Sequence, residues 1–147
     1  MTQTTASAHT TTPARRSRRS PLRTLTRLAL GAAMVGAGMS HLTVARTEFQ
    51  AQVPEWVPAD PDAVVVGSGF AEIALGGGLL LSWGAPRRRI ARLLAVFFIA
   101  VFPGNLSQFV NRRDGFGLDT DAKRGVRLLF QPVLVALALY AGGARRR

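Results

Sequence analysis

Residues 64–83 read VVVGSGFAEIALGGGLLLSW, a run that is apolar or small apart from a single carboxylate, Glu72. Twenty residues form a helix about 30 Å long, which matches the thickness of a bilayer's hydrocarbon core. The run therefore predicts a membrane-spanning helix with a charged side chain near its middle. A carboxylate at that depth costs about 2.5–3.5 kcal/mol on insertion scales, so we expect Glu72 to face the interior of a helix bundle.

The helical neighbours of Glu72 agree with an interior position. Ser68, Gly69 and Gly76 lie at i−4, i−3 and i+4, and such small residues let another helix approach closely. Two interpretations follow. Glu72 either makes a structural hydrogen bond between helices, or it handles a proton or a ligand. The sequence alone does not choose between them.

Three further apolar blocks surround this run. The blocks predict spans at residues 25–44, 63–83, 90–110 and 126–144, the third broken at Pro103-Gly104-Asn105. The expected fold is all-α, a four-helix transmembrane bundle over residues 21–147 that follows a disordered, basic, cytoplasmic tail at 1–20. In the first block Ala32, Gly36 and Ser40 recur every four residues, which predicts a helix-packing face. A cleaved signal peptide is the competing interpretation of that block.

The charge distribution supports a membrane protein and suggests its orientation. The formal net charge is +11, but the basic residues flank apolar blocks, so we expect no nucleic-acid partner. Thirteen of the 19 basic residues fall on the side that would hold both termini, which predicts that both lie in the cytoplasm. The absence of cysteine excludes disulfides and thiolate metal sites in this chain, and two histidines argue against a multi-histidine metal site.

The polar residues inside the blocks predict a site. All of them fall in the same half of the membrane as Glu72, and four different segments contribute: Glu72, His41, Asn105, Gln108, Arg127 and Gln131. They could line one outward-opening pocket with Glu72 at its floor. Each also has a simpler interpretation. Arg127 could reach the headgroups, His41 could hydrogen-bond at the interface, and Asn105 could satisfy carbonyls that Pro103 leaves unpaired.

The order and spacing of five short motifs resemble the DoxX-like family of small bacterial integral membrane proteins. The matching residues are Gly38 and His41, then Val53, Pro54 and Pro58, then Gly69, Glu72, Ile73, Leu75, Gly76, Gly78, Leu79 and Leu80, then Phe102, Pro103 and Asn105, and last Arg127, Leu128, Gln131 and Leu134. The family usually has an aromatic residue after the histidine, where this chain has Leu42. The resemblance covers roughly residues 25–141.

The resemblance implies a four-helix bundle in the bacterial plasma membrane and an uncleaved first span. It implies a non-catalytic membrane subunit or accessory of a quinone-linked oxidoreductase. The chain would then hold no cofactor of its own, quinone being the one cofactor left open, and its partners would be membrane lipid with redox-complex subunits or further copies of itself. The alternative is a small-molecule or proton-coupled transporter that uses the pocket around Glu72, and a purely structural membrane protein is the third class. Whether the chain is an enzyme stays open.

Overall fold

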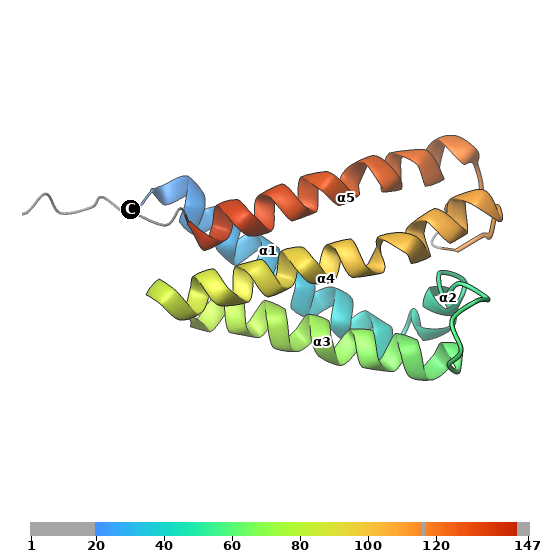
Figure 1. The fold of residues 1–147 in the computed structure, drawn as a ribbon, viewed down its shortest axis with the longest axis horizontal. Helices are drawn as coiled ribbons and strands as arrows, with labels where there is room; N and C mark the ends of the chain where they lie inside the picture. The colour runs from blue at the N-terminus through green and yellow to red at the C-terminus, as the bar shows by residue number, and fades with distance from the viewer. Residues whose placement is uncertain (1–19, 116, 144–147) are drawn as a thin grey trace, which may run out of the picture.

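The computed structural model describes residues 20–115 and 117–143. Within these ranges the chain is helical and has no strand, which confirms the predicted all-α class. The helices are α1 (Pro21–Leu42), α2 (Arg46–Gln50), α3 (Pro61–Leu81), α4 (Gly84–Val110) and α5 (Asp121–Gly142) (Figure 1). The tail predicted at residues 1–20 lies, apart from Ser20, outside the described residues.

Local sequence signals set where the helices begin. The side chains of Ser20, Asp60 and Thr120 cap α1, α3 and α5 by accepting a backbone N–H from the first turn. α4 begins at Gly84, six residues before the predicted start, because Gly84 adopts φ +62° and reverses the chain directly after α3. The three arginines that follow therefore belong to the first turns of α4 rather than to a loop.

The predicted break at Pro103 is wrong. α4 runs through Pro103 without interruption. A proline inside a helix removes one backbone hydrogen bond and disturbs the preceding turn. In that turn the side-chain amide of Gln131, on α5, donates a hydrogen bond to the carbonyl of Phe98. The carbonyl that Pro103 leaves without its helical partner is that of Ile99, so the bond from Gln131 braces the neighbouring position of α4 and does not replace the lost bond.

The four long helices form two closely packed pairs, α1 with α3 and α4 with α5. Glycines bring the backbones of α1 and α3 together. A Cβ placed on Gly38 would lie 2.5 Å from the carbonyl oxygen of Gly69, and one on Gly76 would lie 2.8 Å from that of Gly31. The face predicted from Ala32, Gly36 and Ser40 is therefore wrong, since Ala32 and Gly36 are exposed and a Cβ on Gly36 would meet nothing within 4 Å.

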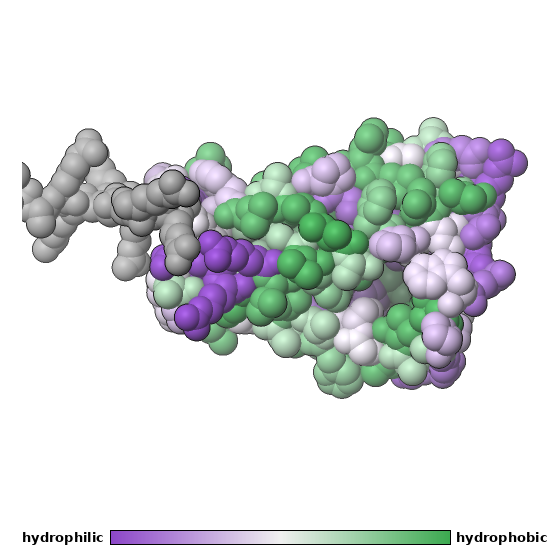
Figure 2. All heavy atoms as spheres, viewed as in Figure 1, coloured by the Kyte–Doolittle hydropathy of each residue, from purple (hydrophilic) through white to green (hydrophobic). Residues whose placement is uncertain are grey.

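Three of the described helices are long and apolar enough to cross a membrane: α3, α4 and α5. Their outward surfaces carry large exposed apolar side chains, among them Phe70, Ile99 and Leu129. Figure 2 shows hydrophobic residues over the middle of the molecule and hydrophilic residues gathered towards both ends. This pattern is that of an integral membrane protein.

α1 does not reach the same apolar content. It contains Arg23, Arg27 and His41 together with many glycines and alanines, which lowers its hydropathy. The buried Arg27 donates a hydrogen bond of 3.0 Å to the carbonyl of Ser82, just after α3, and its guanidinium lies over the ring of Trp83. A fourth membrane crossing by α1 therefore stays a prediction.

Candidate functional site

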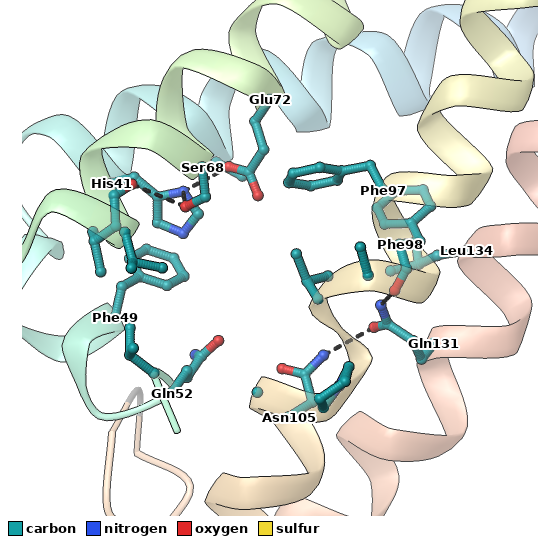
Figure 3. Close-up of a pocket in the computed structure, with 18 of the residues that line it drawn as sticks. His41, Phe49, Gln52, Ser68, Glu72, Phe97, Phe98, Asn105, Gln131 and Leu134 are labelled. Carbon is teal, nitrogen blue, oxygen red and sulfur yellow. Dashed lines mark hydrogen bonds and ion pairs between the residues drawn. The ribbon is translucent and has the colours of Figure 1, made fainter. Parts of the chain in front are cut away.

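A cavity of about 550 Å³ separates the two helix pairs at one end of the molecule. We call this end, where α2 and the loop segments of residues 43–60, 111–115 and 117–120 lie, the loop end (Figure 1). The cavity is mostly apolar and has polar groups on two facing walls (Figure 3). Its polar lining residues are His41, Gln52, Ser68, Glu72, Asn105, Arg127 and Gln131. Both the volume and the composition are typical of small-molecule sites, which span about 300–1,000 Å³.

The first polar wall is built by α1 and α3. His41 Nδ1 lies 2.7 Å from Glu72 Oε2 and 3.5 Å from Ser68 Oγ. Both members of the His41–Glu72 pair are shielded, with side-chain exposures of 7% and 12%. The 2.7 Å contact is a close approach rather than an aligned hydrogen bond, because Glu72 Oε2 accepts no hydrogen bond of regular geometry from the described residues. The ring of Phe49 packs edge-on against His41 and fixes its orientation.

The close α1–α3 packing is what places this pair. A Cβ on Gly69 would lie 2.9 Å from the Cβ of His41, so the histidine sits directly on the glycine backbone. Glu72 lies one turn further along α3, about 16 Å from the start of that helix. The small residues around Glu72 therefore act as the sequence predicted, by admitting a second helix, and the second helix is α1.

The facing wall is a hydrogen-bonded chain from α4 and α5. Arg127 Nε donates to Asn105 Oδ1 at 3.1 Å, and Asn105 Nδ2 donates to Gln131 Oε1 at 3.1 Å. Gln131 in turn donates to the carbonyl of Phe98. Asn105 and Gln131 are both buried. This series of hydrogen bonds fixes the positions of one guanidinium and two amides opposite the His41–Glu72 pair.

The loop of residues 43–60 covers the cavity at the loop end. Gln52 Oε1 accepts a hydrogen bond of 3.0 Å from Arg127, and a Cβ on Gly104 would lie 2.7 Å from the carbonyl oxygen of Gln52. Arg113 donates to the carbonyl of Val53 at 3.0 Å. The sequence predicted a pocket that opens outward, and in the structure the loop lies over it at this end. Signals for this closure are weak, because a polar, proline-rich loop shows no period that would place it over a cavity.

At the other side of the loop, Arg46 ties α2 to the start of α3. Arg46 Nε donates to Asp62 Oδ1 at 2.6 Å, and Gln50 Nε2 donates to the same oxygen at 3.0 Å. The hydrogen bond to Asp62 raises the pKa of Arg46 above its ordinary value, so the pair stays charged at neutral pH. The loop is thus attached to both helix pairs by side-chain bonds.

Five of the six predicted site residues line the cavity: His41, Glu72, Asn105, Arg127 and Gln131. Gln108 does not. It is buried one turn beyond Asn105, beneath Gly115, and neither of its amide atoms has a hydrogen-bond partner among the described residues. The simpler interpretation of Asn105, pairing with carbonyls that Pro103 leaves unpaired, differs from the bonds observed, because the Asn105 side chain bonds Arg127 and Gln131. No pattern in the sequence points to Gln52, whereas Ser68 could have been found from its i−4 spacing to Glu72.

The family to which the chain belongs follows from its sequence match. The model of the family described as "Domain of unknown function (DUF8561)" matches residues 30–141, which include every polar lining residue of the cavity. The chain belongs to the DUF8561 family. No curated protein and no solved structure matches it. Among the described residues of this DUF8561 protein, no group of three or more His, Cys, Asp or Glu side chains could hold a metal ion.

Proposed function

We propose that this DUF8561 protein is a four-crossing, DoxX-like membrane protein that binds a small molecule in the cavity between its two helix pairs. The observation that carries the proposal is the convergence of polar groups from α1, α3, α4, α5 and the loop on one cavity of about 550 Å³. Single residues of this kind often serve packing only. Five segments that direct polar atoms at the same space are better explained by a ligand.

Two polar atoms of the cavity wall support binding over packing. Glu72 Oε2 and Gln52 Nε2 are buried and have no aligned hydrogen-bond partner among the described residues. An unsatisfied buried donor or acceptor costs about 1–3 kcal/mol. One is an acceptor and the other a donor, so a ligand that donates to Glu72 and accepts from Gln52 would satisfy these atoms. The space available is many times the volume of about 30 Å³ that one water molecule occupies.

A proton-coupled transporter is the second candidate function. The observation that favours it is the His41–Glu72 contact, since a titratable pair faces the cavity about halfway along α3. Such buried titratable groups within spanning helices often mark proton or solute pathways. Reconstituted liposomes would separate the two candidates, because a transporter moves solute or protons across the membrane and a binding protein does not.

The role of non-catalytic subunit or accessory in a quinone-linked oxidoreductase is compatible with the proposed site. The support for it is the resemblance to the DoxX-like family, and a quinone bound in the cavity would join it to the ligand-binding proposal. The partners would be redox-complex subunits or further copies of the chain within the membrane. Purification from native membranes should then recover redox subunits together with this chain.

The test of the proposed function is a direct search for the bound molecule. The full chain is purified in mild detergent, and everything extracted from it is identified by mass spectrometry. Ala100 is an exposed residue of the cavity wall, and Ala136 is an exposed residue of α5 away from it. A compound that binds in the cavity should be depleted at least about tenfold in Ala100→Phe, a loss of about 1.4 kcal/mol in affinity, and retained in Ala136→Phe. Equal recovery from both variants would contradict the proposal.

A further inference from the structure

We propose that the cavity is filled from the bilayer and takes an uncharged amphiphile, a molecule with one apolar chain and a hydroxyl or carbonyl head. This inference rests on the proposed ligand-binding function and specifies the ligand's chemistry and its route. The head would lie between the two polar walls, and the chain would lead out between the helix pairs into the lipid. Three features of the cavity carry the argument.

The first feature is the distribution of exposure on the cavity wall. Every lining residue that is exposed is apolar: Ala33, Ala100 and Pro103 lie on α1 and α4, which we take as the mouth, and Trp56 lies on the loop. The polar lining residues are all buried or half-buried. A mouth that led to water would gain from polar rims, whereas a mouth in the hydrocarbon must be apolar. The mouth therefore faces lipid.

The second feature is the closed loop end. Gln52 bonds to Arg127 on α5, and its backbone contacts Gly104 on α4. Arg113 holds Val53 on the same side. A solute arriving from water at this end would have to displace the loop. A molecule in the adjacent leaflet, which the predicted topology makes the outer leaflet, meets only the gap between the helix pairs.

The third feature is the charge balance of the wall. The ionisable lining residues besides His41 are one carboxylate and one guanidinium, Glu72 and Arg127, which attract each other across the cavity. A ligand with a net charge would leave that charge uncompensated in a low-dielectric space, which is costly. An uncharged head that both donates and accepts hydrogen bonds matches the unpartnered Glu72 Oε2 and Gln52 Nε2.

The experiment is photo-crosslinking of the full chain in lipid nanodiscs. The probe is a hexadecanol that carries a diazirine next to its hydroxyl. We expect saturable labelling of lining residues on α4, such as Phe97 and Val101, that unlabelled hexadecanol competes away. Labelling should fall at least fivefold in Ala100→Phe and stay at the wild-type level in Ala136→Phe. Val101→Trp fills the cavity from a second position and is used if Ala100→Phe loses its helical signal.

If the hexadecanol probe does not label as expected, the other probes show which part of the inference is wrong: the route, the uncharged head or ligand binding itself. A short, water-soluble diazirine butanol that labels the same residues while hexadecanol does not would overturn the route and leave ligand binding in place. Stronger labelling by hexadecyl sulfate or hexadecyltrimethylammonium diazirines would overturn the uncharged head. Equal labelling of wild type and both filled variants would show ordinary lipid contact and overturn the inference. No competed labelling by any probe would remove the proposed function as well.

Discussion

At the scale of single residues, Glu72 and Arg127 carry most of the chemistry of the cavity. They face each other from α3 and α5, and each is held by polar partners on its own wall. The insertion cost of a carboxylate in the membrane is reduced when an opposite charge lies nearby. Removing one member of such a pair leaves the other buried and uncompensated, so substitutions here should change ligand preference as well as affinity.

We therefore predict that Glu72→Gln shifts the preference of the cavity from an uncharged to an anionic head. Glutamine keeps the shape and hydrogen-bonding capacity of the side chain, so the fold should stay intact while Arg127 gives the cavity a net positive charge. Labelling by the hexadecanol probe should fall at least fivefold and labelling by the hexadecyl sulfate probe should rise. Arg127→Gln should favour the ammonium probe instead.

The control for this shift is Glu48→Gln, which removes a carboxylate on α2 that does not line the cavity. It should leave both labelling levels unchanged. A Glu72→Gln variant that labels like the wild type with every probe would show that Glu72 serves packing alone.

The sequence predicts an interior Glu72 well, because the cost of a charge in lipid leaves few alternatives. It predicts less well which polar residues join Glu72. Asn105 and Gln108 share a helix face, but only Asn105 lies at the depth of the cavity, and Gln108 lies beneath the following loop. Helical period gives the face of a residue and not the depth at which the opposing helices separate. That depth depends on the loop, whose position no periodic pattern records.

At the scale of elements, the contact between α1 and α3 depends on matched glycines. Gly31 and Gly38 on α1 meet Gly76 and Gly69 on α3, so the two helices share the same seven-residue spacing. Two sets of small residues on α1 could have formed this face: one is Ala32, Gly36 and Ser40, and the other is Gly31 and Gly38. Only the spacing of the glycines on α3 selects the second set. The correct face was thus recoverable from two segments compared together, and not from α1 alone.

The glycine contact gives a stability prediction. Gly38→Ala should destabilise the protein by about 1–3 kcal/mol, because the new Cβ would meet the backbone of Gly69, which cannot move aside. Gly36→Ala and Gly67→Ala have open space around the added carbon and should be neutral or stabilising by up to about 1 kcal/mol, as alanine is the better helix former. Thermal unfolding of the purified variants, followed by circular dichroism, measures the difference. Equal losses at Gly38 and Gly36 would contradict the packing described.

The pairing of α4 with α5 depends on the amide chain beside Pro103. Asn105 and Gln131 join the two helices where proline disturbs α4. A double-mutant cycle with Asn105→Ala and Gln131→Ala should give a coupling free energy of about 0.6 kcal/mol and at most about 1.7 kcal/mol, the range for hydrogen bonds between membrane helices. The same cycle run on Asn105 and Ser107, which this hydrogen bond does not join, should give no coupling. A zero value for Asn105 and Gln131 would mean that the bond contributes nothing to stability.

At the scale of the whole molecule, the number of membrane crossings decides the orientation. α3, α4 and α5 have the length and composition of spans, and α1 is packed along α3 over most of its length although it is less apolar. A helix with a closely packed partner needs less lipid-facing apolar surface of its own. We therefore retain the prediction that α1 crosses the membrane, and we use the arginine distribution as the guide to topology.

We predict four crossings with both termini in the cytoplasm. Reporter fusions after residues 20, 55, 87, 118 and 147 should report inside, outside, inside, outside and inside. The decisive comparison is between residues 20 and 55, because a molecule with only three spans would place both on the same side. An outside signal at residue 87 would contradict the arginine bias that predicts the orientation.

The two helix pairs are joined to each other at the loop end by side-chain bonds from the loop. The helices of each pair are packed against each other along their length. The two pairs are joined at the loop end by polar bonds from the loop, and one of these, the Arg113–Glu55 bond, is exposed. Exposed ion pairs contribute about 0–1 kcal/mol, so the Arg113–Glu55 bond adds little to the attachment of the two helix pairs at the loop end. Arg113→Ala should speed amide hydrogen exchange at residues 51–57 and leave the centre of α1 unchanged. The width of the ligand's apolar chain that can enter between the helix pairs would then be set by a few surface bonds rather than by the helices themselves.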